Sequence, residues 1–148
     1  METCQQKRKT KIQFGIRKNR IESQRELYIS ILASIDKTVR YTTREKDYSD
    51  LIDENTIILA KSKLLATKKI NIKLEEIHDI IQVWSSNYRQ SLPKRIDGIE
   101  MGIITSEDSK YRKKAEELIP HLQKTMGELV EEIKSELNKL SEEIKKNI

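Results

Sequence analysis

Cysteine, proline, glycine and aromatic residues are all scarce in this chain of 148 residues. It contains one cysteine, two prolines and four glycines, and only 5% of its residues are aromatic. The single Cys4 excludes an internal disulfide, which fits a reducing compartment. With so few rings and turn-forming residues, aliphatic contacts between helices must form most of the core.

Long hydrophobic runs are missing as well. No apolar stretch approaches the roughly 18 residues that a membrane-spanning helix needs. Nor does an apolar segment follow the charged N-terminus, as it would in a signal peptide. We therefore expect a cytoplasmic protein, with a peripheral position at the inner membrane surface as the alternative.

Sequence signatures of catalysis and of ligand binding are also absent. The chain has no Gly-rich phosphate loop, no nucleophile elbow and no zinc-type Cys/His cluster. Glu75 and His78 have the Glu-x-x-His spacing of di-iron bundles, but Leu118 stands three residues before the other histidine, His121. We expect His78 to point away from the core into solvent. The sequence thus predicts no enzyme, no metal, no cofactor and no small-molecule ligand.

Lysine, glutamate, isoleucine and leucine dominate what is present, and apolar residues recur at helical spacing. Phe14, Ile21, Tyr28 and Ile35 fall seven residues apart. Gly15 destabilises the start of this helix by about 1 kcal/mol relative to alanine. The full pattern predicts helices near 17–43, 50–67, 71–90 and 107–146.

The segment between residues 50 and 90 allows two interpretations. The apolar stripe changes phase after Leu65, and Asn71 is a good N-cap for a new helix. From Ile70 onward the apolar steps alternate between four and three, as in a coiled coil, and include Trp84 and Tyr88 as core residues. We expect two helices joined by a tight bend, with one kinked helix as the alternative.

Two other segments interrupt the helical pattern. Pro120 predicts a kink or a restart in the last helix. Residues 96–104 are apolar without helical rhythm, and Asp97-Gly98 is a hairpin-turn signal. We expect this loop to cover one end of the bundle.

The predicted fold is all-α: an elongated antiparallel three- or four-helix bundle with long first and last helices. Residues 1–16 form a basic N-terminal arm, and 17–148 form a single helical-bundle domain. The central contact is expected between the first and last helices, which present the following side chains: Ile21, Tyr28 and Ile35 from the first, and Leu122, Leu129 and Ile133 from the last.

Positive charge is concentrated near the N-terminus. The chain has a net charge of +5, with 29 Lys or Arg and 24 Asp or Glu. Residues 1–20 contain seven of the Lys or Arg and only one acidic residue, Glu2. The rest of the chain is therefore nearly neutral, and no second basic patch is expected. The candidate anion-binding residues are Lys7, Arg8, Lys9, Lys11, Arg17, Lys18 and Arg20.

Three segments of the chain carry a family resemblance. They are "RKNRIESQRELYISIL", "AKSKLLATKKINIKLEEIHDIIQVW" and "LVEEIKSELNKL". Over about 17–140 the chain resembles a group of uncharacterised bacterial helical-bundle proteins that often have a membrane-spanning helix before the basic entry. That helix is missing here, and the resemblance implies a cytoplasmic bundle without any established chemistry.

These observations favour a non-catalytic module that binds another protein or a second copy of itself. The exposed parts of the long helices, or the apolar loop at 96–104, would supply that surface. The alternative is that residues 7–20 bind nucleic acid or an anionic lipid surface by releasing counterions.

Overall fold

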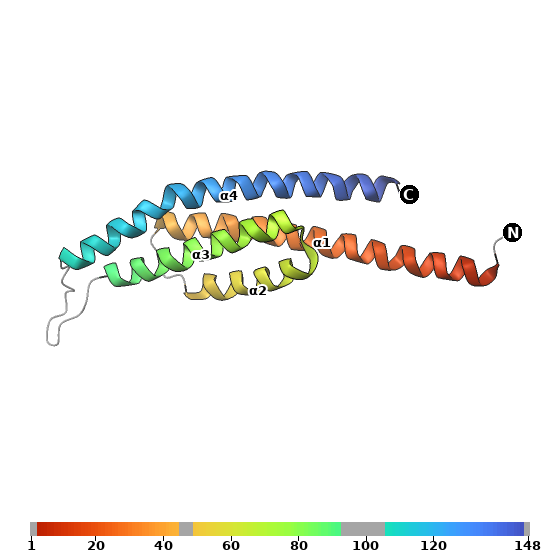
Figure 1. Ribbon diagram of the computed structural model, residues 1–148, viewed down its shortest axis with the longest axis horizontal. Helices are drawn as coiled ribbons and strands as arrows, with labels where there is room; N and C mark the ends of the chain where they lie inside the picture. Colours follow the sequence, from red (N-terminus) through yellow and green to blue (C-terminus); the bar gives the residue numbers. More distant parts are fainter. Residues whose placement is uncertain (1–2, 45–48, 93–105, 147–148) are drawn as a thin grey trace.

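The computed structural model describes residues 3–44, 49–92 and 106–146, and this part of the chain is almost entirely helical. It forms four helices: α1 (Cys4–Arg44), α2 (Ser49–Leu65), α3 (Lys68–Ser91) and α4 (Ser106–Lys146). Successive helices run in opposite directions, so the chain is an antiparallel four-helix bundle (Figure 1). The predicted fold class is confirmed, including the long first and last helices, which have 41 residues each.

Each helix packs against two neighbours. α1 lies beside α2 and α4, and α3 lies beside the same two helices on the other side. The most extensive packing joins α3 to α4, so the expectation that α1 and α4 form the central contact is wrong. α3 and α4 both present a regular apolar seam and pack closely along it, whereas α1, which also extends past the C-terminal end of α4 (Figure 1), packs less closely against that helix.

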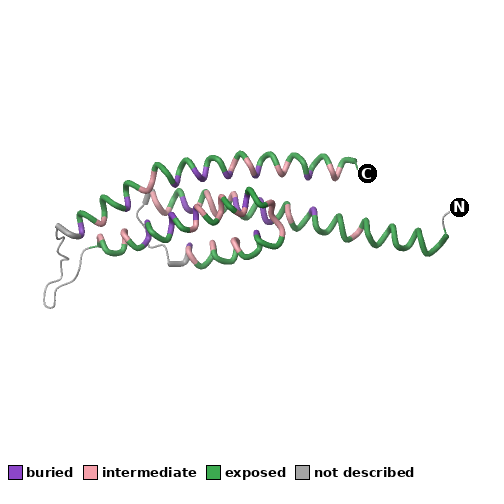
Figure 2. The backbone as a smooth tube through the Cα atoms, viewed as in Figure 1, coloured by how far each residue is buried: buried purple, intermediate pink, exposed green. Residues whose placement is uncertain are grey.

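The core follows the predicted apolar stripes along α3 and α4. Ile70, Ile77, Ile81 and Trp84 of α3 are at most 5% exposed. They face a buried stripe on α4, and the two together appear as the inward purple positions in Figure 2. The α4 stripe comprises Leu122, Met126, Leu129, Ile133 and Leu140.

α1 begins at Cys4, well before the predicted start at residue 17. A capping box explains this early start. The Thr3 hydroxyl accepts a hydrogen bond from the Gln6 backbone N–H at 3.4 Å, and the Gln6 side-chain oxygen accepts from the Thr3 N–H at 3.0 Å. An N-cap stabilises a helix by about 1 kcal/mol, comparable to the cost of Gly15.

The region from residue 50 to 90 forms two helices, as expected, but the cap of α3 is Thr67 and not Asn71. The Thr67 side chain accepts from the Ile70 N–H at 3.5 Å. Asn71 lies within the first turn, where its side-chain oxygen accepts a 2.5 Å hydrogen bond from Ser62 and its amide donates to the Ala66 carbonyl. Asn71 therefore holds the bend closed from inside α3.

α4 continues through Pro120 without a restart and bends in its first half (Figure 1). A proline inside a helix removes one backbone hydrogen bond, which accounts for a kink of this kind. The apolar loop at 96–104, with its Asp97-Gly98 turn signal, lies outside the described residues. Across the described helices, none has a stretch apolar and long enough to cross a membrane.

Candidate functional site

The N-terminal third of α1 projects from the bundle as a single helix. Every described residue from Thr3 to Phe14 is exposed, and Figure 2 shows this end exposed on all sides. We call residues 4–16 the projecting segment. At 1.5 Å per residue it is about 20 Å long. The N-terminal arm expected at 1–16 is therefore helical from Cys4 onward and continuous with α1.

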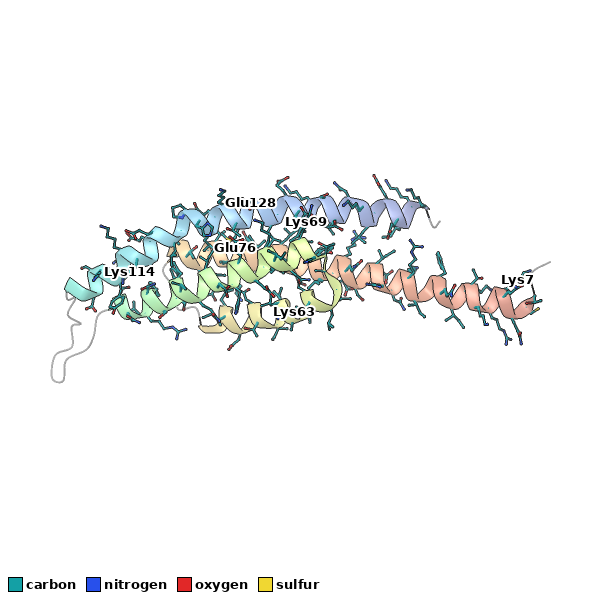
Figure 3. The ribbon with its side chains drawn as sticks, viewed as in Figure 1. Lys7, Lys63, Lys69, Glu76, Lys114 and Glu128 are labelled. Carbon is teal, nitrogen blue, oxygen red and sulfur yellow. The ribbon has the colours of Figure 1, made fainter. Side chains whose placement is uncertain are left out.

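The predicted anion-binding residues all lie on this helix. Lys7, Arg8, Lys9 and Lys11 belong to the projecting segment; Figure 3 labels Lys7 near its tip. The other three follow at its base, where α1 joins the bundle. All seven are exposed: Lys7, Arg8, Lys9, Lys11, Arg17, Lys18 and Arg20.

These cations surround the helix. Successive residues of an α-helix are about 100° apart, so Lys7, Lys11 and Lys18 lie along one side. Lys9 and Arg20 share a second stripe about 170° away from the first. The projecting segment thus presents positive charge in opposite directions.

The fold adds a second set of cations to the same end. The side-chain amide of Gln24 donates a 2.7 Å hydrogen bond to the Leu65 carbonyl, which fixes the α2–α3 turn beside α1. Four exposed lysines flank this turn, and Figure 3 labels two of them there. We call Lys61, Lys63, Lys68 and Lys69 the turn lysines.

α4 completes this end of the bundle near its C-terminus. Arg17 lies 3.7 Å from Glu143, and both side chains are largely exposed. Between α1 and α4 they help to line an open surface groove of about 490 Å³, together with Arg20 and the apolar Ile16 and Ile21. The groove therefore combines guanidinium groups with an apolar floor.

Net charge is strongly unequal along the bundle. We define the basic end as residues 4–25, 61–69 and 137–146, which contain fifteen Lys or Arg and three Asp or Glu. The other described residues contain eleven Lys or Arg and sixteen Asp or Glu. The prediction that the body adds no second basic patch is therefore wrong, because folding joins the turn lysines to the N-terminal cations.

Arg25 and the turn lysines were missed because charge was summed along the sequence. Their charges are cancelled in that sum by acidic residues that the fold places nearer the other end. A local signal was present: Lys-x-Lys before a predicted bend and Lys-Lys after it. Since a tight bend returns the chain on itself, both pairs belong at one end of a bundle.

Lys73 marks the inner limit of this basic surface. Its side chain contacts Glu128 on α4, and Glu76 lies nearby. The hydrogen bond to Glu128 raises the pKa of Lys73, and the same contact lowers the pKa of Glu128. Lys73 is thus engaged within the protein; among the turn lysines, Lys63 also lies near a carboxylate, 3.9 Å from that of Glu75.

His78 differs from its expected position. It is half-buried and lines a small cavity of about 20 Å³ between α1, α2 and α3, beside Asn55 and Thr38. Its Nδ1 is buried without a hydrogen-bond partner, while its Nε2 lies 3.0 Å from the Gln82 amide. Expecting His78 in solvent was wrong because the packed face of α3 is broader than its a/d seam. In the described part of the chain, no three metal-ligating side chains gather into a cluster.

Trp84 and Tyr88 pack into the core, as the sequence predicts. Their rings stack with centroids 4.9 Å apart and planes 10° from parallel, and Trp84 is 3% exposed. A base or another planar ligand could reach Trp84 only by displacing core contacts. Cys4 is exposed on the first turn of the projecting segment.

Comparison of the chain with protein-family models, curated proteins and solved structures finds no match. The resemblance to uncharacterised bacterial helical-bundle proteins therefore stays a prediction from the sequence. The candidate site is defined by its own geometry and charge.

Proposed function

We propose that this protein is a non-catalytic binding module, located in the cytoplasm, that binds an anionic partner through its basic end. The observation that carries this proposal is the charge asymmetry created by the fold. Fifteen Lys or Arg against three Asp or Glu lie at one end of the bundle, and the rest of the described chain has an acidic excess. Such a distribution attracts and orients a polyanion before contact.

The geometry also favours an external partner over an internal role for these cations. Surface ion pairs such as Arg17 with Glu143 or Lys63 with Glu75, at 3.7 and 3.9 Å, contribute little to stability when they are solvated. A helix that projects into solvent with four basic side chains, and carries three more at its base, gains nothing from packing along its first turns. It gains most when phosphates replace the counterions around it.

A salt titration tests this proposal. Binding driven by phosphate contacts weakens by orders of magnitude between about 50 and 200 mM salt, whereas apolar pairing of helices barely changes. The probes are a short DNA duplex and vesicles that contain an anionic phospholipid. Binding to neither probe at low salt would contradict the proposal.

A variant of the projecting segment provides the matched test. Because its side chains are exposed, the substitutions should remove charge without unfolding the bundle. We expect this variant to lose most of its affinity for either probe, with an unchanged thermal unfolding transition. Unchanged affinity would show that the segment is not part of the site. The segment variant carries Lys7→Ser, Arg8→Ser, Lys9→Ser and Lys11→Ser.

A protein partner is the second candidate function, and a surface on α1 and α2 favours it. An open groove of about 570 Å³ lies between these helices, with Leu27 and Ile58 among its lining residues. Ile57 lines this groove, and Leu64 follows seven residues later on the same side of α2; they are 57% and 81% exposed. Together these side chains offer an apolar strip on which another helix could pack.

This candidate is separable from the first by its response to salt. Self-association through the strip would give a mass above that of the monomer in light scattering, and the mass would persist at high salt. Ile57→Ser with Leu64→Ser should then restore the monomer. A monomer at all salt concentrations would exclude pairing of two copies through this strip.

A further inference from the structure

We propose that the anionic partner is duplex DNA, with the projecting segment lying in the major groove and the turn lysines on the flanking phosphates. This inference rests on the proposed function, because it names the partner of the same basic end. Three features of the described residues carry it: the diameter of an isolated helix, the placement of its cations and the placement of its apolar side chains.

The projecting segment has the dimensions of a groove-binding helix. An α-helix with its side chains is about 10–12 Å across, and the major groove of B-form DNA is about 12 Å wide. Every described residue before Gly15 is exposed, so no neighbouring helix blocks entry over most of the segment. The segment can therefore enter a groove without any rearrangement of the bundle.

The cations of the segment match a groove with two phosphate walls. Lys7 and Lys11 point to one side, and Lys9 points about 160° away from each of them. Arg8 lies between the two directions. In a major groove, sugar–phosphate backbones lie on both sides of the helix, so both stripes find anions at once. A flat lipid surface would leave one stripe in water.

The apolar side chains argue against a membrane surface in the same way. Ile12 and Ile16 are 63% and 64% exposed and share one side of the helix. Phe14 is 48% exposed but lies about 200° round the helix from Ile12. A helix that lies in a membrane interface needs one continuous apolar face, and this segment has none.

The turn lysines extend the positive surface beyond the groove. They lie where α1 enters the bundle, since Gln24 binds the Leu65 carbonyl between Lys63 and Lys68. A helix held in the groove would bring this part of the bundle against the adjacent backbone. Backbone contacts of this kind fix orientation without reading sequence, so we expect little sequence preference.

Duplex RNA provides the sharpest comparison probe. Its major groove is deep and narrow, so a helix cannot enter it, although its phosphates attract the same cations. Fluorescence anisotropy would compare labelled DNA and RNA duplexes of one sequence at about 0.1 M salt. We expect tighter binding to DNA. Equal affinity, or a preference for RNA, would overturn insertion into the groove.

Two matched double variants test whether both sides of the helix make contact. Lys7→Gln with Lys11→Gln removes one stripe, and Lys9→Gln with Arg20→Gln removes the other. Each pair removes two charges, and glutamine keeps a high helix propensity. We expect each variant to lose roughly tenfold to a hundredfold in affinity for DNA. The slope of log affinity against log salt concentration should become shallower by about 1.8, since each lost contact changes it by about 0.9.

The outcomes of these experiments separate the inference from the proposed function. If only one stripe matters, or if anionic vesicles are bound and DNA is not, the groove-bound helix is wrong while binding to an anionic surface stands. Absence of binding to DNA, RNA and anionic vesicles at low salt would overturn both. Equal losses from the two stripes, with DNA preferred over RNA, support both.

Discussion

The projecting segment and the middle of α1 have the same apolar repeat but opposite environments. Tyr28 is 1% exposed and Ile21 is 5% exposed, whereas Phe14, one heptad before Ile21, is 48% exposed. The difference comes from the neighbours: α2 and α4 flank the middle of α1, and α1 alone extends past them (Figure 1). A heptad stripe therefore identifies the face that can pack, and the ends of the other helices decide where it does.

The largest expected effect on stability comes from placing an aspartate in the core, compared with placing one on the projecting segment. Leu129 is 0% exposed in the centre of α4, so Leu129→Asp places a carboxylate in the core and should unfold the protein. Phe14→Asp should leave the bundle folded. Circular dichroism with thermal melting checks both. A cooperative melt for Leu129→Asp, or unfolding of Phe14→Asp, would contradict the assignment of the two regions.

Ile35→Asp should have an intermediate effect. Ile35 is only partly buried against the core, although its heptad position matches that of Tyr28. The carboxylate of the introduced aspartate could turn toward water, so we expect Ile35→Asp to destabilise the protein less than Leu129→Asp does, with the fold retained. Urea unfolding of the two variants would rank them. A larger loss for Ile35→Asp would reverse the order of burial.

The two N-caps offer a smaller and more exact contrast. Thr67→Ala removes the cap of α3 and should lower the free energy of unfolding by about 1 kcal/mol. Thr3→Ala removes the capping box of α1 and should shorten the helix without changing global stability, because every described residue from Thr3 to Phe14 is exposed. Helical content and the urea midpoint measure these effects separately. A lower urea midpoint for Thr3→Ala would mean that the projecting segment is coupled to the bundle.

The smallest predicted effect concerns alkaline pH. Burial raises the pKa of the Tyr28 hydroxyl above its usual value of 10.0, although a backbone hydrogen bond at Thr67 partly opposes this and Glu136 adds to it. The stability that this shift contributes is complete below pH 10 and is lost as the pH rises through the raised pKa. Tyr28→Phe should therefore lose less stability than the wild type between about pH 9 and pH 11. If both proteins lose the same free energy of unfolding over this range, the pKa of Tyr28 does not change on folding.

Much of the fold was predictable because the apolar spacing of α3 and α4 is regular. The seam from Ile70 to Trp84 is buried as expected, and the bend between α2 and α3 follows from its phase change. The start of α1 was missed because Gly15 argued for a later start, although Thr3 and Gln6 have the spacing of a capping box. Asn71 was given the role of Thr67 because either residue can cap a helix, and the sequence does not show which one adopts the extended backbone.

Half of the candidate site was predictable, and the other half depended on the fold. The cations of the projecting segment are adjacent in the sequence, so their density is plain without a structure. The turn lysines become part of the site only because antiparallel packing returns the α2–α3 turn to the start of the bundled part of α1. Charge summed along the chain cannot detect that kind of assembly.

The most direct test of this account measures whether the fold joins the two sets of cations into one site. A turn variant is compared with the segment variant by the salt dependence of binding to the DNA duplex. We expect the turn variant to bind more weakly, with a shallower salt dependence and an unchanged melt; affinity and salt dependence equal to the wild type would contradict the account. The turn variant carries Lys61→Ser, Lys63→Ser, Lys68→Ser and Lys69→Ser.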